Sequence, residues 1–140
     1  MKPSGRGNSL PRRPDGRRAY VACELASTVY AIDMGRRQVI ATIKAGSFSN
    51  GVTVAPDGSR VYVSNGKDGT VSAIRSADNQ VEATIPVGKR PWNMAITPDG
   101  RKLYVANGRS NSVSVIDTQR LETIREIPVG ELPWGVVIQP

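Results

Sequence analysis

The stretch PDGSRVYVSNG, residues 56–66, decides the fold because close copies of it occur at a constant spacing. It returns as PDGRKLYVANG at residues 98–108 and, in a more divergent form, as PDGRRAYVACE at residues 14–24. The step between copies is 42 residues both times. Recurrence at a fixed period identifies a repeat protein, in which each copy is one structural unit.

Positions outside this stretch follow the same step. Residues 29–32, 71–74 and 113–116 read VYAI, VSAI and VSVI, and residues 43–46, 85–88 and 127–130 read IKAG, IPVG and IPVG. In the middle repeat the predicted strands are residues 60–64, 70–74, 80–85 and 92–97, separated by turns rich in Gly, Asp and Asn. The last of these segments is nearly uncharged and is expected to be an inner strand buried on both faces. Four short strands per repeat, with no helical periodicity, predict an all-β fold of β-propeller blades.

The predicted units are residues 15–56, 57–98 and 99–140, preceded by a basic tail at residues 1–14. The tail contains Lys2, Arg6, Arg12 and Arg13 and no acid, so it holds more than half of the net charge of +7. A solvated tail or a degraded inner strand is the favoured interpretation. Nucleic acid or anionic lipid held through these cations is an alternative that the sequence does not favour.

Several segments of the last repeat resemble the YVTN family of β-propeller repeats. They are LYVAN (103–107), VSVID (113–117), IPVG (127–130) and PWGV (133–136), and the likeness extends over residues 15–140. The resemblance implies WD40-like blades, about seven in a closed ring, in bacterial or archaeal proteins often exported to the periplasm or cell surface. Family members include surface-layer proteins, binding propellers and relatives of lactonases and quinoprotein-associated proteins. The resemblance therefore implies a binding scaffold or, alternatively, a lactonase-like or quinoprotein-related enzyme.

The position of the Asp-Gly turns fixes the phase of the repeats. The inner strand of a blade precedes this turn, so the chain is expected to begin with the second to fourth strands of one blade. It is expected to end on a lone inner strand, residues 134–139. Three blades do not close a ring, whereas a homodimer that exchanges terminal strands would form six blades with no open edge. The alternative is that the chain is part of a longer propeller.

The composition limits the chemistry available. Cys23 is the only cysteine and there is no histidine, which excludes an intrachain disulfide, the Ser-His-Asp and Cys-His nucleophiles and His-based metal sites. Metal-ligand spacings and Gly-rich phosphate loops are also missing from the sequence. We therefore expect no catalytic residue, no metal and no cofactor. The start does not read as a signal peptide, so only the resemblance suggests a periplasmic or extracellular location. No apolar run is long enough to span a bilayer, so membrane insertion is not expected.

The candidate binding site lies on the loops at one end of the blades, around the predicted channel mouth. Its residues are Lys67, Lys89, Arg90, Trp92, Arg109 and Trp134. Cations beside aromatic rings favour an anionic or planar ligand, and the partner class is a protein, a glycan or another polyanion. In a competing interpretation, the two tryptophans are wedges between adjacent blades.

Other recurring residues are interpreted as structural. Tyr20, Tyr62 and Tyr104 are expected to pack between blades, and Asn65 and Asn107 to begin turns. Asp15, Asp57 and Asp99 recur with the same period and could be seen as a ring of carboxylates. Turn chemistry explains them fully, since Asp precedes Gly in each copy.

Overall fold

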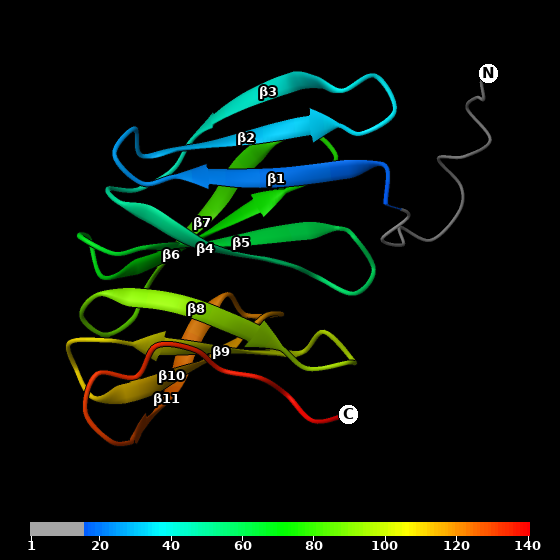
Figure 1. Ribbon diagram of the computed structural model, residues 1–140. Coiled ribbons are helices and arrows are strands. Elements are labelled where there is room, and N and C mark those ends of the chain that lie inside the picture. Colours follow the sequence, from blue (N-terminus) through cyan, green and yellow to red (C-terminus); the bar gives the residue numbers. More distant parts are fainter. Residues whose placement is uncertain (1–15) are drawn as a thin grey trace.

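The computed structural model describes residues 16–140, which form three antiparallel sheets stacked side by side (Figure 1). The first sheet contains β1 (Arg18–Cys23), β2 (Thr28–Asp33) and β3 (Gln38–Lys44). The second contains β4 (Ser49–Val54), β5 (Arg60–Asn65), β6 (Thr70–Arg75) and β7 (Gln80–Pro86). The third contains β8 (Pro91–Ile96), β9 (Lys102–Asn107), β10 (Ser112–Asp117) and β11 (Glu122–Pro128). The predicted all-β fold of propeller blades is confirmed. No helix that could cross a lipid bilayer occurs in residues 16–140. The tail cations Lys2, Arg6, Arg12 and Arg13, and Asp15, lie outside the described residues.

Each sheet is one blade, with its strands in sequence order from the inner to the outer edge. The first sheet has three strands, as the position of the Asp-Gly turns predicts. These turns need a residue with positive φ, and Gly58 supplies it at 76°. The Asp57 carboxylate accepts hydrogen bonds from the backbone N–H and the hydroxyl of Ser59, so it closes the turn.

The prediction of a lone inner strand at residues 134–139 is wrong for the isolated chain. The structure assigns no strand to these residues, although the N–H of Asn93 donates to the carbonyl of Trp134 over 3.4 Å. A β-strand needs a neighbouring strand to satisfy its backbone groups. Within residues 16–140, no strand is available to follow residues 134–139 as β5 follows β4.

The inner strands are also less buried than expected. In β4 and β8 only some residues are buried, and Asn50 and Asn93 are exposed. The reason is geometric, because the inner strand of a propeller blade has the channel rather than another blade on one side. The expectation of burial on both faces is therefore wrong.

The core consists of two apolar layers between successive blades. Val29 and Ile43 of the first blade pack on Val61, Val63 and Ile74 of the second. The equivalent layer between the second and third blades includes Tyr62, Val71, Ile85, Leu103, Val105 and Ile116. Beside each layer an arginine joins the two blades. The Arg18 guanidinium donates to the Ser76 carbonyl over 3.0 Å, and Arg60 donates to the Thr118 carbonyl over 2.8 Å.

Asn65 and Asn107 lie fully buried at strand ends and connect blades, rather than simply beginning turns. The side-chain carbonyl of Asn65 accepts from the backbone N–H of Gly46, and that of Asn107 accepts from Gly88. Both glycines lie in segments that link one blade to the next. A Cβ atom on Gly88 would lie 2.6 Å from the Asn107 side chain, so the link has no room for a larger residue.

Candidate functional site

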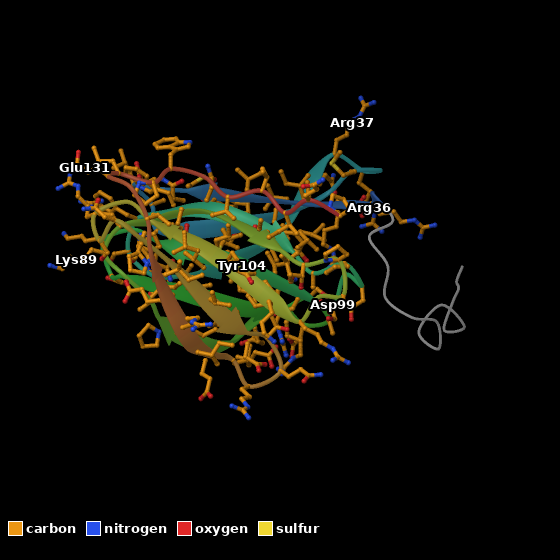
Figure 2. All side chains as sticks on the ribbon, turned by 90° about the horizontal axis from the view of Figure 1, so that it is seen from below. Arg36, Arg37, Lys89, Asp99, Tyr104 and Glu131 are labelled. Carbon is orange, nitrogen blue, oxygen red and sulfur yellow. The ribbon has the colours of Figure 1, made fainter. Side chains whose placement is uncertain are left out.

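One edge of the three blades is formed by two kinds of loop, which we call the loop rim. It comprises the links between blades (residues 45–48, 87–90 and 129–134) and the hairpins after each second strand of the repeat (residues 24–27, 66–69 and 108–111). Figure 2 shows Lys89 and Glu131 at this edge, with Asp99 toward the opposite one. Every sequence-predicted site residue lies on the loop rim or at the start of the adjoining inner strand.

Backbone hydrogen bonds hold each link against the hairpin of the following blade. The N–H of Gly66 donates to the Phe48 carbonyl over 2.8 Å, and that of Gly108 donates to the Arg90 carbonyl over the same distance. Side chains reinforce the pairing, because Asp68 accepts from the Ser47 N–H over 2.8 Å. The loop rim is therefore a fixed surface, built on the rigid sheets beneath it.

Three non-glycine residues at equivalent positions of the links adopt positive φ. These are Phe48 at 60°, Arg90 at 53° and Leu132 at 52°. The left-handed backbone conformation costs an L-residue roughly 1–2 kcal/mol. The surrounding hydrogen bonds must therefore hold these three residues in that conformation. The conformation recurs with the repeat and places one variable side chain per link on the rim.

Lys67 and Arg90 converge on a single aromatic ring. The Lys67 Nζ lies 5.7 Å from the centre of the Phe48 ring, and the Arg90 Cζ lies 5.3 Å from it. Both distances are in the range of cation–π attraction, which orients the two cations without neutralising them. Neither cation forms an ion pair with any residue from 16 to 140. Phe48 was not predicted as a site residue, although it is the only phenylalanine of the chain.

Lys89 and Arg109 are exposed neighbours on the same rim. They are joined only through the backbone, where the Arg109 N–H donates to the Lys89 carbonyl over 3.0 Å. Their side chains also lack an ion pair within the described part of the chain. The rim between the second and third blades thus presents four cations, Lys67, Lys89, Arg90 and Arg109, whose charge is not compensated by contacts in residues 16–140.

Trp92 and Trp134 contact each other at the end of the rim. Their ring centres are 4.7 Å apart and their planes are inclined by 55°. Trp92 also lies over Gly108 of its own blade, where a Cβ atom would be 2.8 Å from the ring. Trp134 is 64% exposed. Trp92 thus packs against its own blade and against Trp134, its counterpart in the next repeat, and the interpretation of both residues as wedges between blades stays a prediction.

The carboxylates of the described residues do not gather into a metal-binding group. No cluster of three or more His, Cys, Asp or Glu side chains occurs in residues 16–140. Asp99 serves its turn, because its carboxylate accepts from the Thr97 hydroxyl and from the Arg101 N–H. These hydrogen bonds lower the pKa of Asp99 below its usual value. Cys23 is half-buried and free.

Comparison with known sequences supports the propeller fold. Residues 10–131 match the family model described as "Lactonase, 7-bladed beta-propeller". No curated protein is similar enough in sequence to count as a match.

Solved structures of larger proteins contain the same arrangement of blades. Hydrazine synthase of Kuenenia stuttgartiensis superposes with a TM-score of 0.83 and 29% identity over 88% of this chain and 37% of its own. Dihydro-heme d1 dehydrogenase NirN, solved in complex with DHE, gives a TM-score of 0.73 and 25% identity, covering 89% and 28% of the two chains. A functionally unknown protein from Desulfotomaculum acetoxidans gives 0.80 and 23%, covering 91% and 44%, and shows the fold alone. The chain spans less than half of each of these proteins.

Proposed function

Since the chain belongs to the lactonase family of seven-bladed β-propellers, its fold is known, and we propose a function for its loop rim. The rim is a non-enzymatic binding site for an anionic partner. A propeller scaffold supports unrelated activities, so the chemistry of the rim has to indicate the function. The partner class is an anionic glycan or an acidic protein surface. The YVTN-like segments, such as residues 103–107, support the same assignment, because that repeat is common in binding propellers.

The observation that supports the proposal is the pair of cations over Phe48. Lys67 and Arg90 come from the second blade and from the link to the third, and the Phe48 ring holds both at less than 6 Å. Side chains already ordered in the free protein lose little conformational entropy when a ligand binds. Sulfate, phosphate and carboxylate groups fit such a pair, since Arg and Lys donate charge-assisted hydrogen bonds to their oxygen atoms.

The rim also holds three acids, Glu24, Asp68 and Glu131, and the first two are engaged in hydrogen bonds within the rim and its adjoining strand. Asp68 accepts the Ser47 N–H, and Glu24 accepts from the Asn50 amide over 3.2 Å. These two carboxylates therefore support the local structure. With four cations and three acids the rim has a net charge of +1. Its cations gather between the second and third blades, where they attract polyanions over several ångströms.

A second candidate is lactone hydrolysis, which the description of the matched family favours. It requires a group that activates water or forms a covalent intermediate. The chain has no histidine to serve as such a base near neutral pH. A carboxylate would have to take this role, and of the rim's acids Asp68 and Glu24 are engaged in the hydrogen bonds described above, which leaves Glu131.

Tryptophan fluorescence provides a direct binding assay, because Trp92 and Trp134 are the only tryptophans and both lie beside the rim. Dextran sulfate is the anionic probe and neutral dextran the control polymer. The double variant Lys67→Gln/Arg90→Gln is expected to bind dextran sulfate about 5- to 30-fold more weakly, from roughly 0.5–1 kcal/mol per exposed charge.

The matched control is Arg37→Gln/Arg101→Gln, which removes the same charge from exposed residues away from the rim. It should change the affinity less than twofold. Equal weakening by both double variants, or no binding of dextran sulfate by the unmodified protein, would overturn the rim as the binding site. Hydrolysis of δ-gluconolactone by the unmodified protein, followed by pH-stat titration, would replace the binding function with the enzymatic one.

A further inference from the structure

One backbone N–H of the loop rim lacks the acceptor that its counterparts have. Phe48, Arg90 and Leu132 occupy the same repeat position in successive links. The Phe48 N–H donates to the Ser27 hydroxyl over 3.2 Å. The Leu132 N–H donates to the side-chain carbonyl of Asn111 over 3.0 Å. No group in residues 16–140 accepts the Arg90 N–H. The second link therefore has a free backbone donor at a position where the other two links have a bonded one.

Glycine at position 69 is the reason for this difference. Ser27, Gly69 and Asn111 are counterparts in the hairpins of the rim, and all three adopt positive φ, at 54°, 68° and 53°. The backbone at this position is therefore alike in the three hairpins, and only the side chain differs. Since glycine has no side chain, the place that the Ser27 hydroxyl takes beside Phe48 stays open beside Arg90. Gly69 and Arg90 are both half-buried members of the rim surface.

Two cations lie at the same hairpin, which joins β5 to β6. Lys67 is part of this hairpin. The Arg90 guanidinium lies along it, because a Cβ atom on Gly66 would be 3.8 Å from the Arg90 Nη1. The hairpin's own acid, Asp68, accepts the Ser47 N–H over 2.8 Å, so its carboxylate is directed toward the first link. The hairpin thus brings a free backbone N–H, a guanidinium and an ammonium group to one edge of the second blade.

We propose that this hairpin binds the sulfate ester groups of a sulfated glycan. The inference rests on the proposed function, because it names the chemical group that the loop rim recognises. The three donors belong to Arg90 and Lys67, and a sulfate ester offers three terminal oxygens to accept from them. A carboxylate has only two oxygens, so an acidic protein surface fits this set of donors less well. Backbone N–H groups in left-handed turn conformations form anion sites in many proteins.

The absence of a free acceptor in this hairpin distinguishes sulfate from phosphate. A phosphate monoester has a second pKa of about 6, so a fraction of its groups still carries a proton near neutral pH. That proton requires an acceptor, and the Asp68 carboxylate already accepts the Ser47 N–H. A sulfate ester is fully ionised and has no proton to donate. A site made of donors alone therefore favours the sulfate ester.

The variant Gly69→Ser tests the free N–H without changing the charge of the rim. Its hydroxyl should accept the Arg90 N–H, as that of Ser27 accepts from Phe48. The affinity for dextran sulfate should then fall about 3- to 10-fold, the equivalent of one lost hydrogen bond. Gly69→Ala is the matched control, because it adds the same Cβ atom, 3.0 Å from the Gly88 carbonyl, but no acceptor. The readout is the ratio between the two variants, and equal affinities would overturn the proposal.

An NMR titration of the isotope-labelled, unmodified protein tests the site without a variant or a polymer. Sodium sulfate should move the Arg90 amide proton downfield more than those of Phe48 and Leu132, which already have acceptors. Sodium acetate and sodium phosphate at the same ionic strength should move it less. An Arg90 amide that ignores sulfate, or that responds as strongly to acetate or to phosphate, would overturn the proposal.

The two proposals fail separately. Binding of dextran sulfate that is equal in Gly69→Ser and Gly69→Ala would remove the sulfate site and leave the rim as a binding surface. A response of the Arg90 amide to sulfate, without any binding of dextran sulfate, would keep the sulfate site and overturn the proposed function.

Discussion

Replacing Asn107 with alanine should destabilise the protein through the link between the second and third blades. Asn107 is fully buried, and its side-chain carbonyl accepts the Gly88 N–H over 3.2 Å. Its amide donates to the Ser112 hydroxyl over 3.2 Å and to the Ser114 hydroxyl over 2.8 Å. Alanine removes all three hydrogen bonds and leaves Ser112 and Ser114 buried and the Gly88 N–H half-buried without its acceptor.

The size of the destabilisation follows from the polar groups that lose their hydrogen-bond partner. A buried N–H without an acceptor costs about 1–3 kcal/mol, and each lost neutral hydrogen bond about 0.5–1.5 kcal/mol. The free energy of unfolding should therefore fall by about 2–5 kcal/mol, a large part of the ~5–15 kcal/mol that stabilises a typical domain.

Denaturation in urea at neutral pH measures this difference, and amide hydrogen exchange locates it. The Gly88 amide should be protected in the unmodified protein and lose its protection in Asn107→Ala. The matched control is Asn50→Ala, since Asn50 is exposed although its side-chain amide donates to the Glu24 carboxylate. The control should change the unfolding free energy by less than about 1 kcal/mol. A loss below about 1 kcal/mol in Asn107→Ala, with Gly88 still protected, would refute the reasoning.

The remaining predictions concern packing between blades and acid stability. A Cβ on Gly51 would lie 2.3 Å from the Trp92 carbonyl, so Gly51→Ala should cost about 1–3 kcal/mol in urea denaturation. Gly130→Ala, where no atom lies within 4 Å, should be neutral in the same assay. Hydrogen bonds from the Thr97 hydroxyl and from the Arg120 N–H lower the pKa values of Asp99 and Asp117. Their stabilisation is present above the unfolded pKa of about 4 and is lost as pH falls below it. Urea midpoints from pH 6 to pH 2 should decrease less steeply in Asp99→Asn/Asp117→Asn, and an unchanged slope would contradict this assignment.

The blades could be predicted from the sequence because a period of 42 residues carries both the turns and the alternation of side chains. The middle repeat shows this well, since predicted strands at 60–64, 70–74 and 80–85 differ from β5, β6 and β7 by one residue at the C-terminal end. Prediction failed where a strand depends on a distant partner. Residues 134–139 have the composition of an inner strand, but strand formation also requires a neighbour that provides hydrogen bonds.

The roles of Asn65 and Asn107 were missed because asparagine is also common in turns. A signal was nevertheless available in the sequence. Hydroxyl residues follow each asparagine by five and seven positions, as Thr70 and Ser72 do after Asn65. These are the groups to which the buried amide donates.

The candidate site was predicted in part. Lys67 and Arg90 were predicted and do lie together, but the ring that joins them belongs to Phe48, which has arginine and leucine as its repeat counterparts. A variable position gives no periodic signal, and the positive φ of these non-glycine residues is not encoded by residue type alone.

The contacts of the buried asparagines form late during synthesis, because each joins a glycine to an asparagine that is made after it. As a chain leaves the ribosome, residue 46 emerges nineteen positions before Asn65, which accepts its N–H over 3.0 Å. The link after one blade therefore forms this hydrogen bond only after two strands of the following blade have emerged. In the same way, the Gly88 N–H gains its acceptor only when Asn107 has been made. A nascent chain halted between these positions would contain the strands of the earlier blade, but the link that follows them would lack its hydrogen bond to the asparagine. Each blade therefore stabilises the blade that was made before it.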